Sequence, residues 1–229
     1  MKVHSSTPYL SLLARHSSYA ALLFGCLTNS PVAQEPASTP GTPTADAPSY
    51  KVGDTWTFIW GRTDSRPGTR LVMTVVAVTE TQTTMSSSWN GGAPKENHYD
   101  SEGNLTRDGN GTTYEPSNGT LSFPMTVGKS WDFHHVRRFT LGTVDVSGHD
   151  EIVAFERVQV PAGSFDAYKI VSQGVIAKQL DRLYDAPFTE TYWYAPSVKK
   201  VIKSDYVLYL NHQALLTRTS ELGAFSLAP

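Results

Sequence analysis

The residues best suited to binding chemistry are His134, His135, Arg137 and Arg138, which lie within five consecutive positions. Successive side chains of a β-strand point to opposite faces. His135 and Arg137 are therefore expected to share one face with neighbouring aromatic residues, while His134 and Arg138 face the other way. If the aromatic face lines a cavity, these two groups would orient an anionic headgroup within an apolar wall. At the rim of a sheet, the same charged side chains would instead reach solvent and lay their stems on apolar surface.

The predicted ligand-lining residues are aromatic side chains of two strands together with this His–Arg pair. They are Trp56, Phe58, Trp131, Phe133, His135, Arg137 and Phe139. The expected ligand is an apolar or amphiphilic small molecule, with its tail against the rings and its head against the polar groups. No cofactor is expected.

Catalysis and metal binding have weaker signals than ligand binding. The G-x-S-x-G nucleophile elbow is absent, and the run PAGSFD lacks the closing glycine. His134 and His135 face opposite sides of a strand, so they cannot chelate one ion together without a bulge. The cluster at residues 149–151 and carboxylate pairs such as Asp145 with Glu151 keep a metal site and a periplasmic hydrolase open as alternatives. The expectation is a non-catalytic protein without a metal.

Apolar and polar residues alternate from Ser49 onward, which predicts β-strands. One predicted strand face carries Tyr50, Val52, Trp56, Phe58 and Trp60. A second predicted face takes every other residue from Trp131 to Leu141. Turn signals such as SRPG, NGG, DGNG and PAG separate the alternating runs.

These runs predict an all-β, mostly antiparallel domain of about ten or more strands. Closing the sheet or packing it on a second sheet removes or shortens exposed edges. Because aromatic residues are spread through most strands, a β-barrel or a half-open curved barrel is favoured. A two-sheet β-sandwich is the alternative.

The amino-terminal segment carries a positive leader with Lys2 and Arg15, a short apolar stretch over residues 19–25, and the ending LFGC. This order resembles the signal peptide and lipobox of bacterial lipoproteins. The resemblance implies cleavage after residues 1–25 and a membrane anchor of lipid chains on Cys26. Because Leu27 rather than aspartate follows the cysteine, the resemblance favours the outer membrane, facing the periplasm. The alternative is an ordinary cleaved signal peptide and a soluble periplasmic or secreted protein.

Residues 26–48 are dense in Pro, Ser, Thr and Ala and show no apolar periodicity. Such a segment buries too little surface to offset its ordering entropy, so it predicts a disordered tether after the lipidated cysteine. The β-domain is then expected at residues 49–229. The chain has 19 basic and 21 acidic residues and no Lys/Arg tract longer than a pair, which argues against a nucleic-acid partner.

Two further elements are VQVPAGSFDAYKI, whose Pro161 and Gly163 predict a hairpin, and TYWYAP, whose Pro196 is expected to end a strand. Together they resemble a class of uncharacterised β-rich bacterial envelope proteins over residues 49–205. The resemblance implies a fold and no agreed activity. The expected function is a lipid-anchored envelope protein that binds an amphiphilic ligand. The main alternative is a protein-interaction module, either an envelope assembly factor or an inhibitor of a periplasmic enzyme, which would use the loop-rich residues 90–122.

Overall fold

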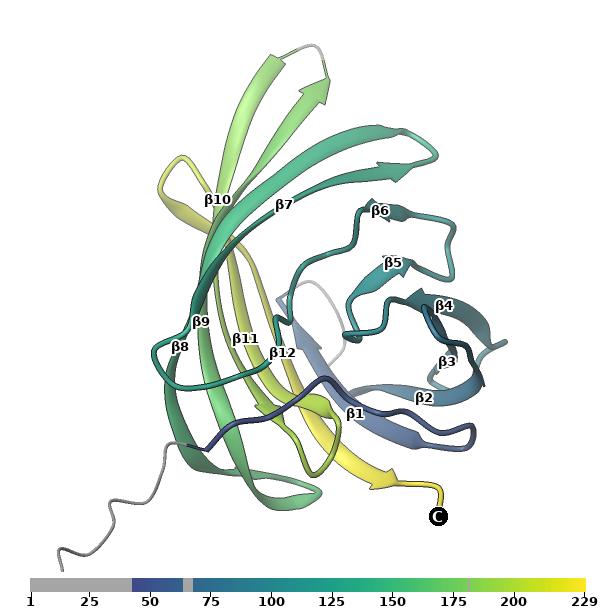
Figure 1. The fold of residues 1–229 in the computed structure, drawn as a ribbon. Helices are drawn as coiled ribbons and strands as arrows, with labels where there is room; N and C mark the ends of the chain where they lie inside the picture. Colours follow the sequence, from purple (N-terminus) through teal and green to yellow (C-terminus); the bar gives the residue numbers. More distant parts are fainter. Residues whose placement is uncertain (1–42, 64–67, 181) are drawn as a thin grey trace, which may run out of the picture. The chain divides into compact units, whose positions relative to one another are not determined.

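Twelve antiparallel strands form one closed barrel within the described part of this computed structural model (Figure 1). The structure describes residues 43–63, 68–180 and 182–229. The strands are β1 (Thr55–Arg62), β2 (Thr69–Val78), β3 (Thr83–Trp89), β4 (Lys95–Tyr99), β5 (Leu105–Arg107), β6 (Thr113–Glu115), β7 (Ser130–Phe139), β8 (Gly142–Val160), β9 (Gly163–Leu180), β10 (Arg182–Ala195), β11 (Lys200–Leu210) and β12 (Gln213–Ser226). Each strand pairs with the next along the chain, and β1 pairs with β12. The prediction of an all-β barrel is confirmed.

Strand length varies around the barrel (Figure 1). Strands β8 and β9 have 19 and 18 residues, whereas β5 and β6 have three each. Val160 pairs with Gly163, so Pro161 and Ala162 form a two-residue hairpin turn as predicted. Strand β10 ends at Ala195, directly before Pro196, which confirms the predicted strand end.

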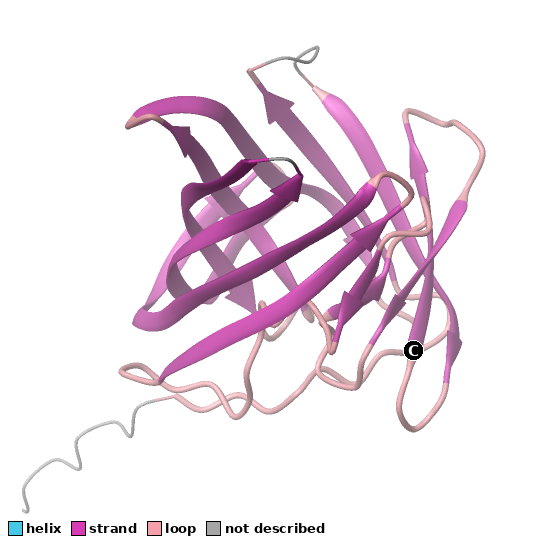
Figure 2. Cartoon of the chain, turned by 90° about the horizontal axis from the view of Figure 1, so that it is seen from above, coloured by secondary structure: helices cyan, strands magenta, loops and turns pink. Residues whose placement is uncertain are grey.

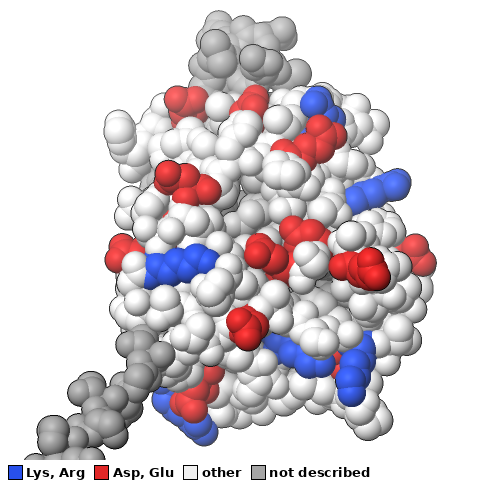
Figure 3. Space-filling model, viewed as in Figure 1, with Lys and Arg blue, Asp and Glu red and all other residues white. Residues whose placement is uncertain are grey.

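The described residues form strands, turns and loops (Figure 2). Among them, we find no helix long and apolar enough to span a membrane. On the face shown in Figure 3, acidic and basic side chains are interspersed.

Alternation along each strand sends one set of side chains inward to form the core. Trp56 and Phe58 of β1 are buried as predicted. Val52 and Leu141, which were expected on the same faces as the core aromatics, are 60% and 81% exposed. Both lie just outside a strand, since β1 begins at Thr55 and β7 ends at Phe139. The period-2 argument fails where the extended backbone gives way to a turn.

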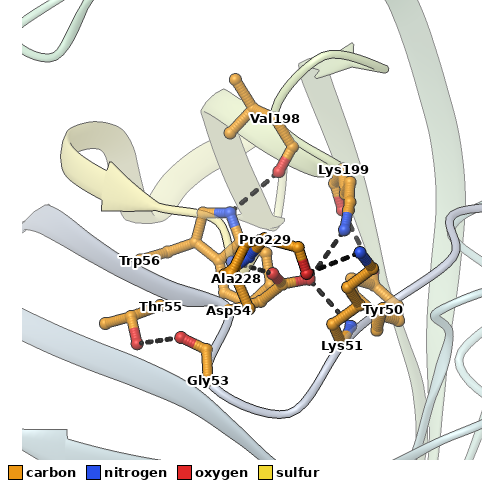
Figure 4. Close-up of polar contacts among 10 residues, drawn as sticks. All are labelled: Tyr50, Lys51, Gly53, Asp54, Thr55, Trp56, Val198, Lys199, Ala228 and Pro229. Atoms are coloured by element: carbon orange, nitrogen blue, oxygen red, sulfur yellow. Dashed lines mark hydrogen bonds and ion pairs between the residues drawn. The ribbon is translucent and has the colours of Figure 1, made fainter.

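A buried carboxylate holds the barrel seam where β1 meets β12 (Figure 4). Asp54 is fully buried and accepts hydrogen bonds from the backbone N–H groups of Lys51 (3.0 Å) and Ala228 (2.8 Å) and from Nζ of Lys199 (2.9 Å). Burial acts to raise the pKa of Asp54, but these donors outweigh it and hold the pKa below its ordinary value. The carboxylate thereby joins the start of β1, the carboxyl terminus and the β10–β11 turn.

Residues 43–48, which the composition assigns to the tether, lie against the barrel. Ala45 is buried and exchanges two backbone hydrogen bonds with Met125, at 3.0 and 2.7 Å. The packed part of the chain therefore begins before Ser49. The signal peptide, Cys26 and the remainder of the predicted tether lie outside the described residues.

Candidate functional site

The inward-facing side chains enclose two adjoining cavities, of about 350 Å³ and 370 Å³. We call these the first and the second cavity. They share the lining residues Trp60, Leu105, Asn118, Thr120, Glu190, Tyr192 and Arg218. The two spaces therefore meet inside the barrel and can hold the two ends of one small molecule.

Two pairs of inward positions shape the apolar wall of the first cavity. Gly148 of β8 pairs with Gly174 of β9, and their outer neighbours in the sheet are Phe133 and Phe188. A Cβ at Gly148 would lie 2.6 Å from the Phe133 ring, and one at Gly174 would lie 2.5 Å from the Phe188 ring. Only glycine leaves room for the rings to lie flat across these strands. The two rings, 6.5 Å apart, then form one side of the cavity.

A group of buried polar atoms in the described residues has no hydrogen-bond partner from the protein. They are Nε1 of Trp60, both ring nitrogens of His135, Nε of Arg137, Oδ1 of Asp150 and Nε of Arg218. All five residues line the first cavity. A buried polar atom without a partner costs about 1–3 kcal/mol. Five residues with unpartnered polar atoms, most of them donors, therefore lie around one space, which suits a site that receives a polar group.

Arg137 and Arg218 supply the positive charge of the first cavity. The Arg137 guanidinium lies 5.3 Å from the Tyr114 ring centre, and that of Arg218 lies 4.6 Å from the Tyr206 ring centre and 5.4 Å from that of Trp60. These rings fix the planes of the guanidinium groups.

The two arginines differ in their acidic neighbours. Arg218 lies 3.9 Å from a carboxylate oxygen of Glu190. Arg137 has no carboxylate within ion-pair distance among the described residues. Its charge is therefore the uncompensated one in the cavity, and it favours an anion.

His135 contributes a neutral ring to the same wall. It is 3% exposed, and it lies beside Phe133 and Tyr114, with ring centres 6.3 and 5.6 Å away. Burial lowers the pKa of His135 to about 4, helped by the nearby positive charge of Arg137. A neutral imidazole offers one donor and one acceptor, so His135 can bind a ligand without adding charge.

Asp150 is one of two acidic groups that line the first cavity, with Glu190, and its surroundings raise its pKa. The Tyr192 hydroxyl lies 2.6 Å from the carbonyl oxygen of Thr120 and 2.9 Å from Oδ2 of Asp150. The single hydroxyl proton satisfies one acceptor, and the carbonyl can only accept. Both contacts are satisfied when Asp150 itself carries a proton. Burial raises the pKa of Asp150 to about 6, which agrees with this arrangement.

This arrangement predicts a pH-dependent stability that Asp150→Asn removes. Because the folded-state pKa of about 6 lies above the ordinary value of 3.8, the stabilising contribution is complete below pH 4 and is lost as the pH rises through 6. We expect the unfolding free energy of the parent protein to fall by about 2–3 kcal/mol relative to Asp150→Asn between pH 4 and 7. Urea denaturation of both proteins across this range measures it. A difference that stays constant with pH would show that Asp150 is ionised throughout.

Of the seven predicted lining residues, four line a cavity and three pack elsewhere in the structure. Phe133, His135 and Arg137 line the first cavity, and Phe58 lines the second. Trp56 is fully buried in the core, and its Nε1 donates to the carbonyl oxygen of Val198 at 2.8 Å. Trp131 donates to the carbonyl oxygen of Gly119 at 3.1 Å. Phe139 packs in a hydrophobic cluster with Val144.

Sequence reasoning missed several residues of the site, above all Asp150, Glu190, Tyr192, Lys200 and Arg218. The alternation of inward and outward residues along the strands could have identified two of them. Arg218 is an even number of positions from the core residue Leu222, and Asp150 is two positions from the core residue Ile152. A charged residue an even number of positions from a core residue of the same strand faces the interior. Charged groups that face the interior mark functional sites more often than surface ones.

The remaining titratable candidates lie on the outside of the barrel. His134 faces away from His135, as alternation predicts, and lies 3.4 Å from Asp145, while His149 contacts Asp132 at 2.7 Å. In the described ranges, no group of three or more His, Cys, Asp or Glu side chains is arranged to hold a metal ion.

Comparison with known proteins identifies the fold. No family model matches the chain, and no curated protein matches its sequence. The chain is similar to a candidate lipoprotein of Parabacteroides distasonis ATCC 8503, with 12% identity, a TM-score of 0.52, and coverage of 80% of this chain and 99% of that one. It is also similar to a candidate exported protein with a YmcC-like fold from Bacteroides fragilis NCTC 9343, with 17% identity, a TM-score of 0.50, and coverage of 80% and 100%. These likenesses show a shared fold.

Proposed function

We propose that this protein is a lipid-anchored component of the bacterial cell envelope whose barrel holds an amphiphilic small molecule without altering it chemically. The observation that supports this most is that every described residue with a buried, unpartnered side-chain N or O atom lines one cavity that also has aromatic walls. A concave site that combines aromatic walls with a few polar groups is typical of ligand-binding barrels.

The polar head of the ligand is an anion. Trp60, Arg137 and Arg218 line the first cavity and each carries a buried N–H group without a partner in the protein, and Arg137 lacks an acidic partner among the described residues. The second cavity, with Leu71, Met73 and Phe58 in its wall, suits the apolar tail. A medium-chain carboxylate such as decanoate combines both features.

Tryptophan fluorescence tests this assignment, because Trp60 lines both cavities. Decanoate added to residues 43–229 is expected to change the emission in a saturable manner with one site per chain. The Trp60→Phe variant provides the control, since its signal should respond far less. An emission that is unchanged, or that drifts linearly with decanoate, would reject the carrier function.

The proposed lipid anchor rests on the resemblance of LFGC, which ends at Cys26, to the lipobox of bacterial lipoproteins. The structural neighbours described as a lipoprotein and an exported protein support an envelope location, and Leu27 supports the outer membrane. We expect Cys26→Ser to move the protein from the membrane fraction to the soluble periplasmic or uncleaved precursor fraction, since two or more acyl chains are needed for stable anchoring. Fractionation followed by immunoblotting measures this. Mature Cys26→Ser protein that stays with the outer membrane would contradict lipid anchoring.

A further inference from the structure

Lys200 is a buried amine that the anion site does not use. It is the first residue of β11, is 9% exposed, and lines the second cavity. Its Nζ lies 4.9, 5.2 and 4.7 Å from the ring centres of Tyr50, Trp56 and Tyr99. Within the described part of the chain, no carboxylate pairs with this amine. A lysine so placed is held by rings alone, at the wall of a space large enough for a ligand.

Neighbouring lysines show how unusual this environment is. Lys199, one residue earlier, forms an ion pair with Asp54 at 2.9 Å, and Lys203 on the same strand forms one with Glu221 at 3.1 Å. A carboxylate partner holds the ammonium form, whereas burial without such a partner favours the free amine. Burial lowers the pKa of Lys200 to about 7, so a large fraction of this side chain is an uncharged nucleophile at neutral pH.

We propose that Lys200 forms an imine with the carbonyl carbon of an aldehyde-bearing amphiphile held in the second cavity. The amine nitrogen adds to the carbonyl carbon, and the carbonyl oxygen takes up a proton to give a carbinolamine. The C–O bond then breaks, water leaves with the second amine proton, and a C=N bond remains. No oxidant or reductant is consumed. Burial raises the pKa of Tyr99 further above its ordinary value of 10.0, so the adjacent ring surface is uncharged at neutral pH.

The apolar lining explains why the adduct would persist. Leu71, Met73 and Phe58 form an apolar part of the wall of the same cavity, and a medium-chain aldehyde would bury its tail against them. This chemistry uses the second cavity and Lys200, so it does not depend on the anion site around Arg137.

Trapping with octanal tests the proposal on the full chain reconstituted in phosphatidylcholine vesicles. Octanal is added with cyanoborohydride, which reduces an imine to a stable amine, and the alkylated lysines are located by peptide mass mapping. At pH 7 we expect Lys200 to be alkylated about tenfold faster than Lys203, because far more of it is unprotonated. Its rate should level off above a pH near 7.

Two variants make the result decisive. Lys200→Met, which keeps an unbranched apolar side chain of similar length, should remove the fast-labelled site, and Lys203→Met should leave it intact. Labelling of Lys200 no faster than Lys203, or at a rate that does not level off near pH 7, would overturn the proposal and assign Lys200 a purely structural cation–π role. Decanoate binding measured by fluorescence on the same protein reports on the anion site separately, so failure of one proposal is distinguishable from failure of the other.

Discussion

Replacing Arg137 with methionine is expected to weaken decanoate binding by about 10- to 150-fold, which corresponds to the 1.5–3 kcal/mol of one hydrogen bond to a charged group. Arg137 is the cavity guanidinium that lacks an acidic partner among the described residues, and its Nε is unpaired. Methionine retains a flexible apolar stem, so the packing against Tyr114 is largely preserved. The affinity is measured by fluorescence titration at pH 7.5, where decanoate is ionised.

The neighbouring residue provides a matched control. Arg138 lies on the same strand, faces outward and pairs with Glu115 at 3.3 Å. Arg138→Met should change the affinity for decanoate by less than about twofold, since an exposed ion pair contributes little. Decanol, which has the same tail and no charge, should bind both variants equally. Equal losses for decanoate and decanol in Arg137→Met would show that Arg137 supports the wall and does not receive the head.

Replacing Trp56 with alanine is expected to lower the free energy of unfolding by about 3–5 kcal/mol. Trp56 is fully excluded from solvent within a large core cluster, and its Nε1 donates to the carbonyl oxygen of Val198 at 2.8 Å. The substitution leaves a cavity and an unpaired carbonyl, and it removes one of the three rings around Lys200. Urea denaturation at neutral pH measures the loss.

Trp89 is the control for this substitution, because it is the same residue type at an exposed site. Its side chain is 45% exposed at the end of β3, so Trp89→Ala should cost about 1 kcal/mol or less. Similar losses at both positions would mean that Trp56 is not the core residue that its burial indicates.

The sequence predicts the strands of this fold well and their spatial partners poorly. Alternation identified the inward aromatics Trp56, Phe58 and Phe133, and the two-residue turn at Pro161 followed from local backbone chemistry. Alternation also separated His134 from His135 correctly. It failed at Val52 and Leu141 because apolar residues continue past the strand ends into turns.

Which residues come together in the site could not be predicted from the sequence, because this depends on how the barrel closes. Trp60 and Arg218 meet only because β1 pairs with β12 at the seam. Asp150 and Tyr192 meet across β9, 42 positions apart in sequence. Each residue carries a local signal of facing inward, but the register that places their side chains around one space is set by long-range pairing.

The barrel arrangement also explains how charged groups are tolerated inside it. Glu190 is partly buried, and desolvation raises its pKa, while Arg218 at 3.9 Å opposes that effect. His135 is neutral because of burial, whereas Asp150, whose pKa burial raises to about 6, is a neutral acid only below that pH. Arg137 is the cavity arginine with no carboxylate within ion-pair distance among the described residues, so its guanidinium is the group that can pair with an anionic ligand.

Native mass spectrometry of residues 43–229, purified from a bacterial periplasm without detergent, would test ligand carriage most directly. The predicted result is a mass above that of the denatured chain by the mass of one amphiphile, with the increment lost from most of the Arg137→Met molecules. A mass equal to the bare chain, unchanged after incubation with decanoate and with envelope lipids, would contradict carriage. The barrel would then act through its outer surface.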